Sequence, residues 1–343
     1  MRFFTLTGGL SYKWNRTEYY KILDDLLGGD YYVNIDQFAE RDYAAYPTMI
    51  QNDLDYYLQH GKAQTLKAGD KYGYDYYANV RRAEAWASGR FTVGGLDASV
   101  AGRIGYSKFW RDGLVRKGLF PGLDSNGQPM TYDGNVITTY DPISGEVISS
   151  LGKSEVKDFI TGAAKLNLSY VIRGGHRIYA DAAYLADAPT FNQAFVSPRT
   201  RNSIVPDLKT VKTLTADLNY AYSNAGYDVR VTGFYTTIKD QSKVMSFYDD
   251  VQNSFTNFAM SGIDERHIGM ELGFKVPLPL PNLSLQGVLS YGQYVYTSNP
   301  KMYQTYDNSA AVVEETYGVT IPYWKSHPTA DGKTVRHYVS GTP

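Results

Sequence analysis

Residues 96–107, LDASVAGRIGYS, alternate between two kinds of side chain. Leu96, Val100 and Ile104 fall on one face of an extended strand, whereas Asp97 and Arg103 fall on the other. This pattern is typical of a half-buried strand in a soluble protein. It is equally typical of a strand with lipid on one side and water on the other. The connections between strands distinguish the two environments.

Eight other stretches show the same alternation, so the sequence predicts an all-β, antiparallel chain of about nine strands. The predicted strands are residues 3–13, 81–93, 96–108, 159–172, 176–186, 211–223, 227–239, 265–276 and 283–297. Only 81–93 is less regular, because Trp86 falls on the polar side.

The predicted connections alternate between long and short. Short ones are residues 94–95, 174–175, 224–226 and 277–282, and long ones are about 14–80, 109–158, 187–210, 240–264 and 298 onward. A soluble sandwich has no reason to keep this order, whereas outer-membrane barrels have short periplasmic turns and long extracellular loops. The order favours a transmembrane β-barrel whose lipid-facing side carries Val100.

Aromatic residues support the same interpretation. The chain has 343 residues, including 32 Tyr, 14 Phe and 4 Trp. On the apolar face, Tyr12, Tyr106, Tyr184 and Tyr235 lie near the outer strand ends, and Tyr170, Tyr220, Tyr222 and Phe274 near the inner ends. Two aromatic bands suit the two membrane interfaces. The alternative is that strand ends simply favour Tyr, which has a high β propensity.

Composition excludes several classes of protein. The net charge is −1, with 34 basic and 35 acidic residues, so no nucleic-acid partner is expected. The absence of Cys excludes disulfides and Cys-ligated metals. An odd number of strands would leave edges open in lipid, so we expect the chain to be part of a larger barrel, unless several copies assemble into one.

The loops contain few chemical motifs. PTMIQNDLDYYLQHG, residues 47–61, predicts a helix with Pro47 in its first turn, Gly61 at its end and His60 as a surface residue. DSNG at 124–127 resembles the start of a calcium loop but lacks the later ligands, and turn chemistry explains it. Five scattered His residues form no catalytic pattern, so we expect no enzyme activity, cofactor or metal site.

Ligand-binding candidates come from two loops and from the polar strand faces. In 187–210, Phe191, Phe195, Arg199 and Arg201 could contact an anionic or sugar-like ligand by stacking and forked hydrogen bonds, or could pack between loops. The remaining candidates are Trp110 and Arg111 in the 109–158 loop, and Arg103, Lys165, Asp217, Arg230 and Glu271 on the polar faces.

Several stretches occur in an order that resembles TonB-dependent outer-membrane receptors, in the middle to late part of their barrel. In that family an AP-x-F turn leads to a P-x-L-K-x-E element before a strand. Residues 188–191 (APTF) and 206–209 (PDLK) match, and Val211 replaces the Glu. The family's GID/N-x-R-x-x-G-x-E segment matches 262–271 (GIDERHIGME). Further similar stretches are 110–121, 151–159, 184–202, 206–220, 234–250 and 262–273.

The resemblance implies a barrel of about 22 strands filled by an N-terminal plug. Residues 1–343 would belong to one barrel domain, with the plug and the closing strands absent. The implied function is uptake of a scarce, large nutrient such as an iron chelate, cobalamin or an oligosaccharide, driven by TonB. The implied location is the outer membrane of a Gram-negative bacterium. The implied partners are lipid, TonB through the plug, and a surface lipoprotein. A passive porin and a soluble β-sandwich binding or adhesion module are the alternatives.

Overall fold

The computed structural model describes residues 3–250, 254–309 and 312–316. Nine long strands pair antiparallel in chain order and form most of a 12-stranded sheet. They are β1 (Phe4–Ile22), β4 (Lys71–Val93), β5 (Leu96–Gly113), β9 (Lys157–Val171), β10 (His176–Asp187), β11 (Val211–Asn224), β12 (Tyr227–Asp249), β13 (Ser254–Pro277) and β14 (Ser284–Tyr296). The predicted fold class is confirmed.

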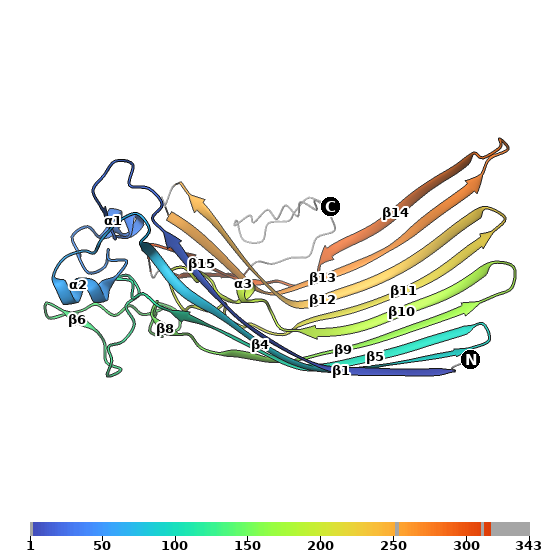
Figure 1. Cartoon of the computed structure of the whole chain (residues 1–343), viewed down its shortest axis with the longest axis horizontal. Coiled ribbons are helices and arrows are strands. Elements are labelled where there is room, and N and C mark those ends of the chain that lie inside the picture. The colour runs from blue at the N-terminus through green and yellow to red at the C-terminus, as the bar shows by residue number, and fades with distance from the viewer. Residues whose placement is uncertain (1–2, 251–253, 310–311, 317–343) are drawn as a thin grey trace.

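The remaining strands are short. β8 (Gly152–Lys153) pairs with β5, and β15 (Lys301–Tyr306) joins β13 to β16 (Val312–Thr316). Two separate two-stranded sheets pair β2 (Tyr32–Val33) with β3 (Thr65–Leu66), and β6 (Thr131–Tyr132) with β7 (Asn135–Val136). The long strands curve into a trough with the connecting loops at one end and the hairpin turns at the other (Figure 1).

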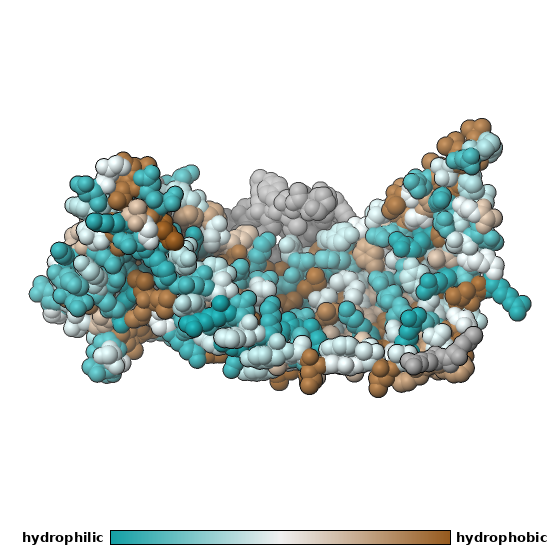
Figure 2. Space-filling model, in the orientation of Figure 1, coloured by the Kyte–Doolittle hydropathy of each residue, from teal (hydrophilic) through white to brown (hydrophobic). Residues whose placement is uncertain are grey.

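The strand register gives the sheet one apolar and one polar face. Val100 lies opposite Gly89 on β4 and Leu166 on β9, and Leu218 lies opposite Ala180 and Gly233. Because paired residues share a face, the apolar positions of all nine strands lie on the same side. Their side chains are uncovered, and Figure 2 shows apolar residues projecting from the convex lower edge of the trough.

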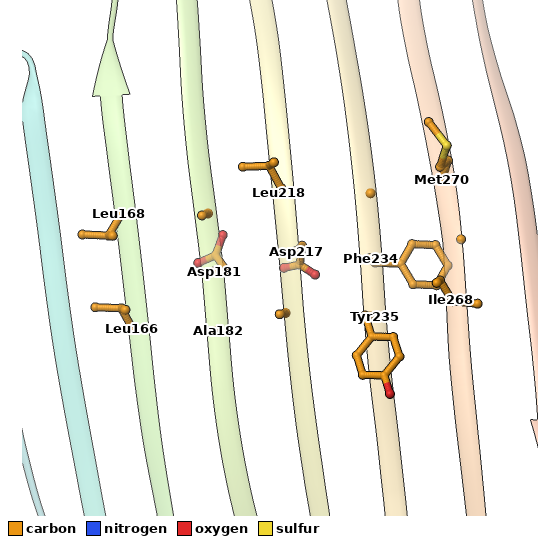
Figure 3. Close-up of a pocket in the computed structure, with 14 residues that line it drawn as sticks. Leu166, Leu168, Asp181, Ala182, Asp217, Leu218, Phe234, Tyr235, Ile268 and Met270 are labelled. Carbon is orange, nitrogen blue, oxygen red and sulfur yellow. The ribbon is translucent and has the colours of Figure 1, made fainter. Parts of the chain in front are cut away.

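A shallow groove of about 520 Å³ crosses this apolar face over β9 to β13. Its floor is formed by small residues such as Ala182 and Ala216, and larger side chains such as Leu168, Leu218 and Met270 flank it (Figure 3).

The strands extend further toward the loop end than the alternation predicts. β1 continues to Ile22 and β4 begins at Lys71, inside the predicted loop 14–80. Most of the predicted loop 240–264 is paired strand, because β12 reaches Asp249 and β13 begins at Ser254. In these extensions loops cover the concave face, so polar and apolar residues no longer alternate.

The predicted helix is shorter than expected. Helix α2 (Leu54–His60) begins after Asp53, whose carboxylate accepts the Tyr56 N–H at 2.9 Å, and ends at Gly61 with φ 68°. Residues 47–50 form a turn instead, because Gln51 pairs with Ile35. Helices α1 (Gln37–Tyr43) and α3 (Phe191–Ala194) were not expected. No helix in the described part of the chain is long and apolar enough to cross a membrane.

The hydrophobic core lies at the loop end of the concave face. One cluster joins Ala39 of α1 to Leu119, Phe120 and Ile148. Two others pack α3 and the loop after it onto the sheet, and their buried members are Phe109, Ala194 and Phe195, and Val196, Val205, Ala259 and Tyr303. The loops therefore form an ordered layer over the outer end of the trough.

Candidate functional site

A cavity of about 330 Å³ lies between this loop layer and the concave face of the sheet. Its walls come from the ends of β1 and β4, residues 32–38, Lys117, residues 199–200, the start of β13 and Asp307. Segments distant in sequence therefore meet at one site. The lining combines charged and aromatic side chains, which are Lys21, Asp36, Lys117, Arg199 and Asp307, and Tyr32, Phe38, Tyr72, Tyr74 and Phe255.

Lys21 lies at the outer end of β1, where the pairing of β1 with β4 shifts after Tyr20. The shift places Lys21 opposite Tyr72. The ammonium of Lys21 lies 5.2 Å from the ring centroid of Tyr72 and 5.5 Å from that of Tyr74. Both distances are within the range of cation–π attraction.

Asp36 and Lys117, both in the lining of the cavity, form a close ion pair at 3.0 Å. Lys117 also donates to Asn52 Oδ1 at 2.6 Å, and Asp36 Oδ1 accepts the N–H groups of Phe38 and Ala39 at the start of α1. Burial raises the pKa of Asp36, but the charge and hydrogen bond of Lys117, together with the backbone N–H groups of Ala39 and Phe38, outweigh it and lower the pKa below the usual 3.8. Asp36 is therefore ionised and fully engaged.

Arg199 and Asp307 also line the cavity. The Arg199 guanidinium is 5.2 Å from the ring centroid of Phe255. Asp307 Oδ1 accepts hydrogen bonds of 2.8 Å from Ser197 Oγ and from Asn257 Nδ2. The Asp307 carboxylate is thus held by neutral donors, away from a direct ion pair with Arg199.

The four candidates of the 187–210 loop separate in space. Arg199 lines the cavity. Phe191 and Phe195 pack together, with ring centroids 4.4 Å apart, and both contact Phe109. Arg201 is buried, with its guanidinium 4.8 Å from the Phe120 ring. Apart from Arg199, these residues hold the loop layer together.

Arg111 and Trp110 point to opposite sides of β5. Arg111 is 2% exposed and faces the loop layer, where it donates to the carbonyls of Ser150 and Pro198 at 2.7 Å each. Trp110 lies on the convex side, and its Nε1–H donates to Asp112 at 3.1 Å. Neither residue lines the cavity.

The polar strand candidates all lie on the concave face. Arg103 joins a cluster of ion pairs, 2.6 Å from Asp187 and 3.1 Å from Glu84, and Arg82 contacts the same two carboxylates. The register places the other four on this face too, namely Lys165, Asp217, Arg230 and Glu271. They line the middle and turn end of the trough rather than the cavity.

Sequence reasoning missed Lys21, Lys117 and the tyrosines of the cavity. Lys21, Tyr72 and Tyr74 lie within the predicted loop 14–80, where no alternation assigned a face. A continuation of β1 to residue 22 would have placed Lys21 on the same face as Lys13. No local signal connects Lys117 to Asp36, because 81 positions separate them.

Comparison with known proteins gives a match at the level of fold. No protein-family model matches the chain, and no curated protein shows a significant sequence match. A solved structure of the copper transporter OprC matches with a TM-score of 0.50 and 10% sequence identity. The match covers 89% of this chain and 42% of that chain, so this chain spans less than half of the transporter's length. At this identity the similarity concerns the fold alone.

Proposed function

We propose that the chain forms part of the barrel wall of an outer-membrane transporter. The observation that carries this proposal is the continuous, uncovered apolar face over nine strands, opposite a concave face with charged clusters. Lipid would cover the first face without cost, whereas an unpaired polar group there would cost several kcal/mol, about 2–4 for Arg at the bilayer midplane. The fold shared with a transporter supports the same conclusion.

A TonB-dependent receptor is the class we propose within this group. The APTF turn directly follows β10, and the PDLK segment ends one residue before β11, as in the family pattern. We propose that the parent protein contains an N-terminal plug that binds ligand jointly with the loop layer, and that TonB acts through that plug. A surface lipoprotein is a further proposed partner. Copper, which is named for OprC, is not proposed as the ligand of this chain, because the two proteins share the fold alone.

Two measurements on the protein expressed from its complete gene in its native host test this function. Membrane fractionation should place it in the outer membrane, with faster gel migration before boiling than after. The purified protein should also retain the periplasmic domain of TonB on an affinity column. A protein that is located in the outer membrane, does not bind TonB and gives a steady ion conductance in planar bilayers would be a passive porin rather than a TonB-dependent receptor. Recovery in the soluble fraction would contradict both.

A further inference from the structure

The loop-end cavity holds two cations that no carboxylate neutralises. Among the residues that the structure describes, the side chains of Lys21 and Arg199 form no ion pair and donate no hydrogen bond. Lys21 lies over the rings of Tyr72 and Tyr74, and Arg199 lies over the ring of Phe255. A lysine ammonium has three donors and an arginine guanidinium five, and ring faces use none of them as hydrogen bonds to oxygen. These donors remain available at the cavity wall.

The two carboxylates of the cavity do not offset these cations directly. Asp36 is held by Lys117 at 3.0 Å and by the first turn of α1. Asp307 accepts from Ser197 and Asn257. With three cations and two carboxylates in the lining, the cavity keeps a positive surplus beside Lys21 and Arg199.

Five of the other lining residues are aromatic, and they restrict the class of ligand further. Phe38 and Phe255 meet edge to face at 5.9 Å, and Tyr32 meets Tyr72 at 5.5 Å. Flat rings of this kind present surfaces for stacking, and Tyr hydroxyls add hydrogen bonds. A bare inorganic anion would leave these surfaces unused, whereas an anion carried on a ring would use both features.

We infer that this cavity binds a carboxylate-bearing ring of the transported ligand, with the carboxylate between Lys21 and Arg199 and the ring against the aromatic lining. The inference rests on the proposed uptake function and names the chemistry of its ligand. An acidic sugar and an aromatic acid share this chemistry. A lipid headgroup is disfavoured, because the residues that line the cavity belong to the loop layer and the concave side rather than to the apolar face that lipid would cover.

Saturation-transfer NMR on the protein from its complete gene, in detergent, tests this inference with two matched pairs of probes. Glucuronate is compared with glucose, and benzoate with benzyl alcohol. We expect at least one carboxylate to bind about tenfold more tightly than its uncharged counterpart. A hydrogen bond to a charged group changes a dissociation constant by about this factor. Stronger binding of glucuronate would indicate an acidic sugar, and stronger binding of benzoate an aromatic acid.

The variant Lys21→Met/Arg199→Met should lose about tenfold in carboxylate affinity. Lys67→Met/Arg173→Met, which removes two exposed cations outside the cavity, should bind like the wild type. Lys21→Arg/Arg199→Lys keeps both charges and should retain measurable binding, which controls for misfolding of the first variant. Equal binding of charged and uncharged probes, no binding of either carboxylate, or unchanged affinity in a folded Lys21→Met/Arg199→Met variant would overturn the inference.

Fractionation of the same protein separates this result from the proposed function. If the protein enters the outer membrane but binds neither carboxylate, the transporter proposal stands and the proposed ligand class is refuted. A soluble protein removes the transporter proposal, whichever probe the cavity binds.

Discussion

Arg111 shows how single side chains hold the loop layer on the sheet. Its guanidinium donates to carbonyls of two separate loops, at Ser150 and Pro198, and lies 4.9 Å from the Tyr76 ring. Arg201 acts similarly, with hydrogen bonds to the carbonyls of Tyr306 and Ser309. In both cases a buried guanidinium donates to backbone oxygens rather than to a carboxylate.

Replacing Arg111 by Met should therefore loosen the loop layer. The carbonyls of Ser150 and Pro198 would lose a charged donor inside the protein, at a cost of about 3 kcal/mol. We expect limited proteolysis in residues 144–154 and 196–204 to become several-fold faster. Arg173→Met, at an exposed turn, is the control and should leave the cleavage rate unchanged. Equal cleavage rates in the two variants would contradict this role.

Gly113 marks a second close contact between strand and loop. A Cβ atom at Gly113 would lie 1.8 Å from the carbonyl oxygen of Ser150, whereas a Cβ at Gly233 would meet nothing within 4 Å. Gly113→Ala should lower the free energy of unfolding by about 1–3 kcal/mol, and Gly233→Ala should leave it nearly unchanged. Denaturant unfolding in detergent measures both, and a neutral Gly113→Ala would refute the contact.

At the scale of elements, α1 depends on an ionised Asp36. The pKa of Asp36 is lower in the folded protein than its usual value, so its stabilising effect is complete above about pH 4 and is lost as pH falls through the folded value. Asp36→Asn should lower stability by about 1–3 kcal/mol at neutral pH, because Lys117 keeps Asn52 but loses its carboxylate.

The pH dependence of that difference provides the measurement. The gap between wild type and Asp36→Asn should stay constant from pH 7 to pH 5 and shrink below about pH 4. Asp55→Asn is the matched control, since its ion pair with Arg116 is exposed and should contribute little. A gap as large at pH 3 as at pH 7 would exclude an effect of the Asp36 charge.

The two faces of β5 predict opposite effects for one substitution. Val100→Arg places a charge on the apolar face and should cost about 2–4 kcal/mol in a bilayer, which would reduce the folded outer-membrane yield. Ser99→Arg, one position away on the concave face, should leave the yield unchanged. The yields are compared as the fraction of protein with faster gel migration before boiling, and equal losses would count against the assignment of faces.

All nine long strands were predictable from the sequence, whereas their outer extensions were not. Between the hairpin turns and the loop layer one face is apolar and the other polar, so period-2 alternation is strong. Near the loops both faces of β4 are covered, and the adjacent residues Asp75 and Tyr76 are both buried. Alternation therefore disappears at this end, and α1 is too short to give a helical period of its own.

At the scale of the whole molecule, the candidate site could be predicted only in part. Arg199 was a candidate because its loop is rich in Phe and Arg. Lys21 and Lys117 reach the same cavity through long-range pairing, which no local pattern encodes. A site formed by the loops of a barrel can be located only when the strand pairing, and therefore the neighbours of each strand end, is known.

The sheet itself has edges without partners among the described residues, at β1 and along β14. Such edges expose backbone donors and acceptors, which lipid cannot satisfy. We therefore propose that strands other than these twelve close the barrel. This proposal agrees with the chain spanning only 42% of the transporter that it matches.

The medium that surrounds the convex face decides whether the sheet faces a membrane. The chain contains no Cys, so single cysteines can be placed at Val100, Leu168 and Leu218, with Thr7 and Ser99 on the concave face as controls. Spin labels at these positions in the protein from its complete gene, reconstituted in bilayers, report the surrounding medium. We predict relaxation by lipid-soluble oxygen at the three convex positions and by a water-soluble nickel chelate at the two controls. Relaxation by the chelate alone at all three convex positions would contradict a membrane-facing sheet.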